Sequence, residues 1–458
     1  MSTHRLDSPP GEPYLLLDDL GLAGGPVTLR TEEVVVPRLI DRDGVNIFVM
    51  MTPLLFLAQM GIYGAVLFTV SVIVYALRHR GSLGEVFRTQ NFFLLFPAYA
   101  MLSAIWSEAQ VDTLKHASEF MLTVVAALLM VQARNRRSLM FALFAAFAVY
   151  SLAPLMSGSA VDADGTTALA SLSANNHAEA GVAATGAIIT LAWFFLGFKT
   201  RRYFQSLLAL PVLAVEIYSV VLARSAEATI ALAAGLIVFL LLAMLSRAGR
   251  RLRLVVVGFG GAGALALAVI FMIFTGPIID FVSIWSGKEI TLTGHDYLWA
   301  RARDLIVEKP ILGRGFAGFW QHGNLDAEGL WQFAHITSRT GFNFHNTGYD
   351  ILVSLGWVGL ILFALTLVVG LVKMAAVYVN GPSLLTAFWL ALAASIVARL
   401  PVETMGIYEF SAATILLFAI FGYAVKAKRV HERQALQATR DAPLRGTLLS
   451  PIPPMSNC

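Results

Sequence analysis

Long apolar runs with almost no charge recur from residue 45 to residue 425, separated by short polar connections. A helix needs about 20 such residues to cross a bilayer. The first run, Val45–Leu77, is too long for one span, and we expect it to divide into two at Gly61–Gly64. Ten further spans are predicted at residues 91–107, 116–133, 138–157, 178–197, 204–223, 226–245, 254–274, 352–373, 384–398 and 410–425. The pattern therefore predicts an all-α polytopic integral membrane protein with about twelve transmembrane helices.

One interruption of this pattern, between the ninth and tenth predicted spans, is much longer than the others. It covers residues 275–351 and contains four of the eight tryptophans and four of the nine histidines. A disordered linker is poor in aromatic residues, so we expect this loop to form a folded, partly helical cap outside the membrane. The remaining polar parts are an N-terminal region, 1–44, and a tail, 426–458, that we expect to be disordered.

Composition supports the membrane assignment and excludes several other classes. Hydrophobic residues make up 57% of the chain and charged residues 14%, against about 25% charged in soluble proteins. The single cysteine, Cys458, excludes intramolecular disulfides and cysteine-based metal sites. The basic residues lie mostly in short connections, so we expect no nucleic-acid partner. The polar first 44 residues contain no segment typical of a cleavable signal peptide.

Basic residues alternate between successive connections. Every second short connection is rich in lysine and arginine, whereas the others contain only Lys115, Arg224 and Arg399. The basic connections carry Arg78, Arg80, Arg88, Arg134, Arg136, Arg137, Lys199, Arg201, Arg202, Arg247, Arg250, Arg251, Arg253 and Lys373. Connections rich in basic residues remain on the cytoplasmic side, so both termini are predicted to be cytoplasmic and the large loop to face the other side.

Arg224 and Arg399 break this alternation at the outer ends of their spans. Either each extends its side chain to lipid phosphates, or the two bind a phosphate-bearing ligand, for which the forked guanidinium is well suited. The sequence leaves both readings open. Lys115 is expected to be simply solvated.

Within the large loop, Tyr297–Glu308 has helical periodicity and ends before Pro310. Its apolar face holds Leu298, Trp299, Ala302 and Leu305, while Arg301 and Arg303 project from other faces. The next stretch, Ile311–Trp320, contains three glycines. They permit either close backbone approach to a ligand or an ordinary tight loop.

His345 and Asn346 lie where the loop re-enters the membrane, flanked by Phe342 and Phe344. Desolvation would favour the neutral imidazole, which suits a general base. A structural role in capping the following helix is an equal alternative. The histidines of the loop lack acidic or histidine partners at helical spacing, so we predict no metal site. No nucleophilic serine motif or phosphate-binding loop is present.

Two segments, GHDYLWARARDLIVEKPILGRGFAGF and FHNTGYDILVSLGWVGL, resemble the O-antigen ligase and polymerase superfamily of bacterial envelope glycan enzymes. Asn175-Asn176 resembles a short asparagine motif of the same superfamily. His295 stands where that superfamily has an arginine, so Arg301 or Arg303 is expected to substitute for it. The superfamily has Ser-Arg before the eighth span, and Arg224-Ser225 stands here in its place, shifted by one position. These departures resemble the exopolysaccharide-polymerase branch.

The resemblance implies metal-independent glycosyl transfer on the periplasmic face of the inner membrane, with no cofactor. The donor is expected to be a glycan on undecaprenyl diphosphate. His345 is expected to act as the base. The residues expected to bind the diphosphate or sugars are Arg224, Arg301, Arg303, Arg314, Arg399, Asn346, His295 and Asn176. Membrane lipid, a chain-length regulator and export machinery are the other implied partners.

The sequence thus favours a polysaccharide polymerase that transfers a growing chain to an incoming lipid-linked repeat unit. A ligase acting on a lipid A-core acceptor is the alternative enzyme. A transporter or flippase of the same lipid-linked sugar is the alternative of another class. A transporter is expected to carry ionisable residues near the membrane midplane, whereas here the unusual charges gather at the outer boundary.

Overall fold

The computed structural model describes residues 39–157, 159–161, 167–169, 176–223, 225–264, 295–337, 339 and 342–448. The N-terminal residues 1–38, Arg224 and residues 265–294 lie outside the described residues. Two short strands, β1 (Ser159–Val161) and β2 (Thr167–Leu169), form an antiparallel pair. The helices of the described residues include α2 (Arg42–Leu55), α3 (Leu57–Met60), α4 (Ile62–Arg78), α5 (Arg80–Thr89), η1 (Asn91–Leu94), α6 (Leu95–Leu102), η2 (Ser103–Ile105), α7 (Gln110–Met130), α8 (Arg136–Ser157), α9 (Asn176–Lys199), α10 (Tyr203–Leu222), α11 (Ala226–Leu245), α13 (His295–Glu308), α14 (Leu325–Phe333), α15 (Thr347–Asn380), α16 (Leu384–Arg399) and α17 (Ala412–Leu448).

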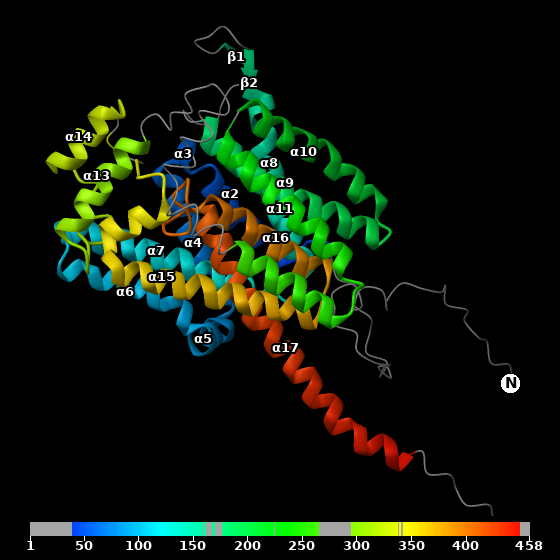
Figure 1. The fold of residues 1–458 in the computed structure, drawn as a ribbon. Coiled ribbons are helices and arrows are strands. Elements are labelled where there is room, and N and C mark those ends of the chain that lie inside the picture. The colour runs from blue at the N-terminus through cyan, green and yellow to red at the C-terminus, as the bar shows by residue number, and fades with distance from the viewer. Residues whose placement is uncertain are drawn as a thin grey trace, which may run out of the picture.

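The apolar helices form one bundle, with α13 and α14 at one end of it and the last part of α17 extending from the other (Figure 1). The predicted spans within the described residues are mostly helical, although residues 91–107 are divided among η1, α6 and η2. Among these residues, six helices are long and apolar enough to cross a membrane, or seven if the bent pair α4–α5 forms one span. The chain is therefore a multi-pass helical membrane protein. The count of twelve spans stays a prediction.

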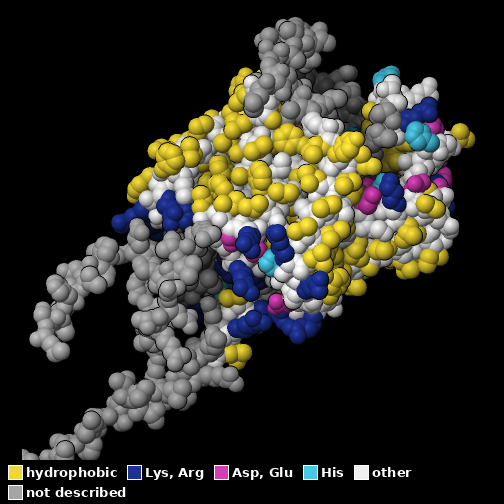
Figure 2. Space-filling view, turned by 180° about the vertical axis from the view of Figure 1, so that it is seen from behind, with side chains coloured by type: hydrophobic (Ala, Val, Ile, Leu, Met, Phe, Trp, Pro, Cys, Tyr) yellow, Lys and Arg dark blue, Asp and Glu magenta, His cyan; other side chains and the backbone are white. Residues whose placement is uncertain are grey.

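The surface of the bundle is broadly hydrophobic, as expected of a face in contact with lipid (Figure 2). Exposed apolar side chains include Ile62, Leu207, Val221, Ile237 and Met244. Lys and Arg side chains are most numerous along one margin of this surface, together with some acidic and histidine side chains, and a second group of charged side chains and histidines lies near the opposite end.

The first apolar run breaks where the sequence predicts. Gly61 has a φ of 52°, a left-handed conformation that ends α3 and precedes α4. Beyond the break the chain turns back against α2, as the position of Gly64 close to the carbonyl oxygen of Pro53 shows. The break is therefore confirmed, while the separate crossing of the membrane by each half stays a prediction.

Contacts between distant connections gather the basic ones at one end of the bundle. Arg253 Nε donates to the carbonyl of Val379 over 3.2 Å, and Arg429 lies 2.6 Å from Glu85. Lys426 Nζ donates to the carbonyls of Val131 and Ala133 after the end of α7, where a cation is favourable. The basic connections thus share one end of the molecule.

The predicted disordered tail is helical over most of its length. α17 continues without a break from the last predicted span to Leu448. The residues just beyond the span are mostly alanine, lysine, arginine, glutamate and glutamine, which favour helix. Their helix propensity explains the continuation. Residues 449–458 lie outside the described residues.

The cap has its own apolar core. The helix predicted at Tyr297–Glu308 is confirmed, since α13 covers His295–Glu308. Leu298, Trp299, Ala302 and Leu305 of α13 are all buried there, against α14 and the segment that leads into α15. Trp299 Nε1 donates to the carbonyl of Phe344 over 2.8 Å. The cap core is therefore fastened directly beside His345.

The glycine-rich stretch after α13 packs against a kink in α15. Gly356 has a φ of 63° and interrupts the helix, so nearby backbone groups need new partners. Trp357 N donates to the carbonyl of Pro310 over 2.9 Å, and Gly315 N donates to that of Ser354 over 2.8 Å. A Cβ at Gly356 would lie 2.2 Å from the Ile311 carbonyl oxygen. The close approach that Gly313 permits is therefore to α15, whereas Gly315 and Gly318 lie close to Ser107 in the connection before α7.

Candidate functional site

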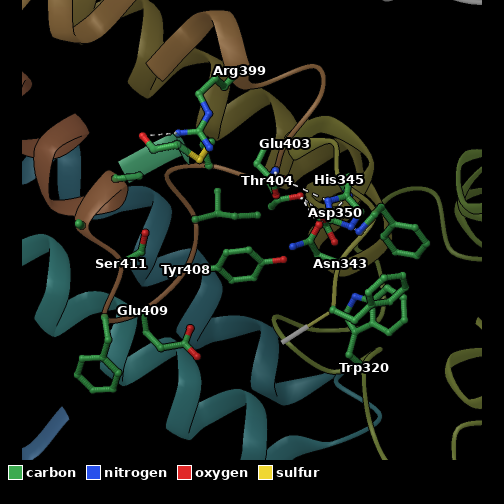
Figure 3. A pocket seen from close by; sticks show the side chains of 18 of the residues that line it. Trp320, Asn343, His345, Asp350, Arg399, Glu403, Thr404, Tyr408, Glu409 and Ser411 are labelled. Carbon is green, nitrogen blue, oxygen red and sulfur yellow. Dashed lines mark hydrogen bonds and ion pairs between the residues drawn. The ribbon is translucent and has the colours of Figure 1, made fainter. Parts of the chain in front are cut away.

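A cavity of about 1190 Å³ lies between the cap and the end of the helix bundle (Figure 3). Its apolar wall includes Leu54, Phe147 and Phe316, and its polar wall includes His345, Arg399 and Glu403. Trp320 and Phe342 of the cap face it as well. The α16–α17 connection (residues 400–411) supplies a large part of the lining, so the cavity is not formed by the large loop alone.

His345 is held at this cavity in a constrained conformation. Its φ of 49° is left-handed, which is uncommon for a residue other than glycine and is often found at functional sites. The backbone N–H of His345 donates to Asn343 Oδ1 over 2.7 Å. His345 Nδ1 lies 3.2 Å from Glu403 Oε2, at hydrogen-bonding distance. The local fold thus presents the imidazole with a carboxylate behind it.

The pKa of His345 is higher than the 6.5 of a free histidine. Burial lowers this pKa, but the hydrogen bond and charge of Glu403, with the charges of Asp350 and Glu227, raise it by more. Burial raises the pKa of Glu403, and the bond to His345 outweighs burial, so that the net pKa is lowered. Desolvation alone predicts the opposite direction for the pKa of His345, because it leaves out Glu403, which lies 58 residues along the chain.

Several hydrogen bonds fix the α16–α17 connection against the start of α15. Asn346 Nδ2 donates to the carbonyl of Pro401 over 2.8 Å, and Thr347 Oγ1 donates to that of Glu403 over 2.9 Å. Asp350 accepts from both Phe344 N and Thr404 Oγ1. These bonds set the position of Glu403 relative to His345, so the pair is built into the backbone arrangement.

Arg399 is buried at the end of α16, with its side chain only 7% exposed. Its Nη2 lies 3.3 Å from Glu227 Oε1 in the first turn of α11. Nη1 donates to the carbonyl of Gly181 over 3.5 Å, and a Cβ at Gly181 would lie 2.4 Å from Nη2. Among the described residues, Arg399 Nε and Glu227 Oε2 are buried without hydrogen-bond partners. Arg399 is thus a buried cation at the cavity whose bonding capacity is only partly used.

Three other predicted arginines do not line the cavity. Arg301 pairs with Asp326 over 2.5 Å, and Arg303 Nη1 donates to Tyr349 Oη over 3.3 Å. Arg314 is buried between Glu108 and Glu308 and ties the cap to the connection before α7. Each therefore has a structural partner within the described residues. None of these three arginines lies at the cavity with His345.

The remaining predicted residues are placed as follows. Asn346 caps α15 by accepting from Tyr349 N over 3.1 Å, and it is not part of the cavity lining. His295 and Asn176 begin α13 and α9, but their side chains are not among those described. Arg224 lies outside the described residues. Of the predicted set, the described cavity thus brings together His345 and Arg399.

Sequence reasoning missed Glu403, Glu227 and a second group formed by His116, Glu119 and Glu409. Glu403 and Glu227 occur close to the two unusual arginines, at VARLPVET and ARSAEATIAL, which was the available signal. The helical spacing of His116 and Glu119 was a further signal. Their partner Glu409 is 293 residues from His116, and no local pattern indicates that pairing.

Comparisons with known proteins place part of this chain beside envelope polysaccharide proteins. The family model described as O-antigen ligase matches residues 212–364, which include the second half of α10, all of α11, the cap and His345. This match confirms the resemblance to the O-antigen ligase family. The exopolysaccharide production protein ExoQ of Rhizobium meliloti (strain 1021) is 30% identical over 281 residues, or 60% of this chain. The chain spans 62% of the length of that relative. The matched O-antigen ligase segment ends before Arg399 and Glu403, so the cavity extends beyond it.

Proposed function

We propose that this protein is a cell-envelope polysaccharide polymerase. It transfers a growing glycan from a polyprenyl diphosphate, undecaprenyl diphosphate in bacteria, to a hydroxyl of an incoming lipid-linked repeat unit. The observation that carries the proposal is the hydrogen-bonded pair His345–Glu403 in one cavity with the buried Arg399. The match to the O-antigen ligase family and the similarity to an exopolysaccharide production protein support it.

In the proposed reaction, His345 removes the proton of the acceptor hydroxyl. We assign the proton between the ring and Glu403 to Nδ1, since the carboxylate can only accept it, and Nε2 is then the basic nitrogen. The acceptor oxygen forms a bond to the anomeric carbon of the donor glycan while the bond from that carbon to the diphosphate oxygen breaks. The lipid diphosphate leaves with the electron pair. Glu403 stabilises the imidazolium that forms, as a carboxylate does in other histidine-based sites.

Arg399 is proposed to bind the leaving diphosphate. A guanidinium stabilises phosphate oxygens with two parallel hydrogen bonds, and it does so more strongly where water is excluded. Trp320 and Phe342, which line the cavity, offer apolar faces against which sugar rings can stack. Glu227 neutralises Arg399 before the substrate binds. The polar wall would then contact the diphosphate and acceptor while the cap contacts the glycan.

The position of the cavity fits a substrate anchored in the membrane. It lies at the end of the apolar bundle opposite the basic connections. We propose that these connections and both termini are cytoplasmic and that the cavity faces the periplasm of the inner membrane. A lipid tail could then remain in the bilayer while its diphosphate reaches Arg399.

The test of this function is the length distribution of glycans in cells that lack the protein. Loss of high-molecular-weight polysaccharide, with single lipid-linked units accumulating at the outer face, is the expected result. Restoration by the wild-type gene completes the experiment. Long lipid-linked chains that remain unattached would instead indicate a ligase, which the family description favours as the second candidate. Units retained on the cytoplasmic face would indicate a flippase and contradict both enzymatic proposals.

Glu403→Gln is expected to move the acidic limb of the pH–rate profile to lower pH. Activity needs neutral His345, so it rises with pH through the pKa of that residue, which lies above 6.5. Removing the carboxylate leaves the lowering effect of burial, so the pKa falls. The rate at high pH also falls because the base is weaker and less well oriented.

The measurement is the rate of polymerisation by the purified protein against pH, with lipid-linked repeat units as substrate. Glu432→Gln is the control, because this glutamate pairs with Lys428 on α17, outside the cavity lining. An acidic limb that stays in place in Glu403→Gln would show that Glu403 does not set the pKa of the base.

A further inference from the structure

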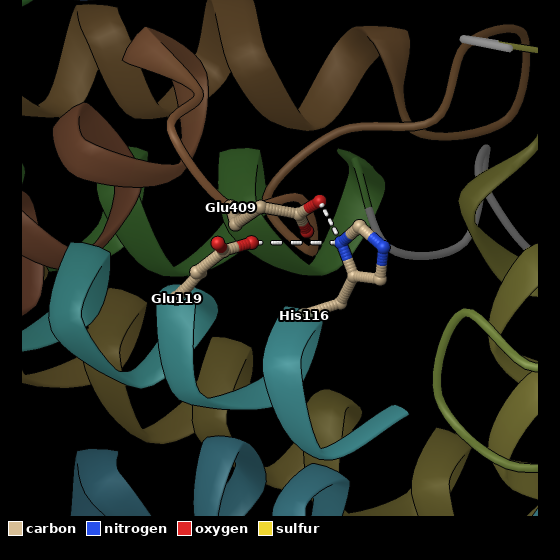
Figure 4. A group of neighbouring side chains, drawn as sticks. All are labelled: His116, Glu119 and Glu409. Carbon is tan, nitrogen blue, oxygen red and sulfur yellow. Dashed lines mark hydrogen bonds and ion pairs between the residues drawn. The ribbon is translucent and has the colours of Figure 1, made fainter. Parts of the chain in front are cut away.

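A second group of polar side chains lies at the same cavity, apart from His345. His116 and Glu119 are one helical turn apart on α7, and Glu409 reaches them from the α16–α17 connection (Figure 4). His116 Nδ1 lies 2.8 Å from Glu409 Oε1 and 3.6 Å from Glu119 Oε2. The three ligand atoms all lie within 4.8 Å of one another.

These distances suit a common metal ion. Ligand atoms that each bind a metal at about 2.0–2.2 Å lie roughly 3 Å apart when they are neighbours in its coordination shell. The two distances from His116 are close to this value, and a small movement of Glu119 would bring the third ligand into place. The geometry therefore needs little rearrangement.

The chemistry of the three groups selects a class of ion. One imidazole nitrogen and two carboxylates suit zinc, manganese or a related transition metal, whereas calcium and magnesium prefer oxygen ligands alone. The two glutamates also match the charge of a divalent cation. The sequence prediction of no metal site considered only the histidines of the large loop and did not include His116.

The group is also held in place from both sides. Phe410, next to Glu409, donates its backbone N–H to Thr123 Oγ1 of α7 over 3.0 Å, so the connection is fastened to the helix that carries His116. His116 and Glu409 line the cavity, and their side chains are 30% and 20% exposed. A bound ion would therefore have coordination positions open to the cavity.

We propose that His116, Glu119 and Glu409 bind one divalent transition-metal cation in the wall of this cavity. The site is separate from the acid–base step assigned to His345, and its existence does not depend on the proposed function. The alternative is that no metal binds and that a protonated His116 side chain pairs with the two carboxylates.

The test uses the full-length protein, purified in detergent without a histidine tag and stripped of metals with a chelator. Binding of Zn²⁺ is measured by titration calorimetry and binding of Mn²⁺ by electron paramagnetic resonance. We expect one ion per chain in the wild type. His116→Ala and Glu409→Gln are each expected to weaken binding by about tenfold or more, since even outer-shell substitutions cost 10–100-fold.

His322→Ala is the matched control, because this histidine lines the same cavity but belongs to no metal-ligating group among the described residues. It is expected to bind like the wild type. Glu409→Gln preserves the size of the side chain. Its elution from size-exclusion chromatography as a single species, like the wild type, establishes that the variant is folded. Absence of saturable binding in the wild type, or equal binding by His116→Ala and the wild type, would overturn the proposal. Either result would leave the assignment of His345 untouched.

Discussion

Replacing His345 is expected to reduce polysaccharide polymerisation by about 10²–10⁴-fold, the contribution typical of a positioned general base. The informative substitution is His345→Asn. Its left-handed backbone, with a φ of 49°, is tolerated by asparagine at lower cost than by alanine. Asparagine removes the base and preserves the conformation, so loss of activity cannot be ascribed to a distorted loop. His345→Ala is expected to lose activity equally and to be less stable.

The measurement is the rate at which high-molecular-weight glycan forms, with each variant present at equal level in the membrane. His322→Ala serves as the control, since it removes another histidine of the same cavity and is expected to retain activity. Substantial activity in His345→Asn would remove this residue from the proposed chemistry. It would leave the family relationship intact, and another group at the cavity would have to be the base.

Arg399→Gln is expected to destabilise the protein by up to about 3–5 kcal/mol, because the buried carboxyl group of Glu227 would lose its cation and would have to stay charged without a partner or take up a proton. The double variant Arg399→Gln/Glu227→Gln replaces both charges and is expected to regain most of that stability. Activity is expected to stay low, by about 10²–10³-fold, if the guanidinium stabilises the leaving diphosphate. Stability and catalysis would then separate.

Thermal unfolding in detergent and the polymerisation rate are to be measured for the wild type, both single variants and the double variant. Glu227→Gln alone retains Arg399 and shows what the carboxylate contributes. Recovery of both stability and activity in the double variant would show that Arg399 acts only through its ion pair with Glu227. In that case the diphosphate must be bound by other residues.

The helices were predictable because the physical cause is local. Each span follows from a run of apolar residues, and the face of α13 follows from the spacing of Leu298, Trp299, Ala302 and Leu305. The break at Gly61 likewise follows from one residue and its backbone freedom. The extension of α17 was missed because the prolines at 451, 453 and 454 were taken as a sign of disorder for the whole tail, although the residue types just beyond the span favour helix.

The site was predictable only in part because its partners come from distant segments. His345 and Arg399 stood out by their own context, but the charge that each faces was hidden in another helix or connection. Arg301 and Arg314 were predicted to bind substrate but form structural ion pairs instead. Their acidic partners are Asp326 and Glu108, respectively. A long-range ion pair leaves no periodic trace in the sequence.

The short connection between α16 and α17 also limits how this protein can be altered. It begins directly after Arg399 and contains both Glu403 and Glu409, so one stretch of backbone spaces the three polar groups along the cavity wall. An insertion or deletion there would misplace more than one group at once. Chimeras that exchange residues 399–411 as a single block should therefore keep the spacing of these three groups, and they should work only where the host retains the partners Glu227, His345 and His116.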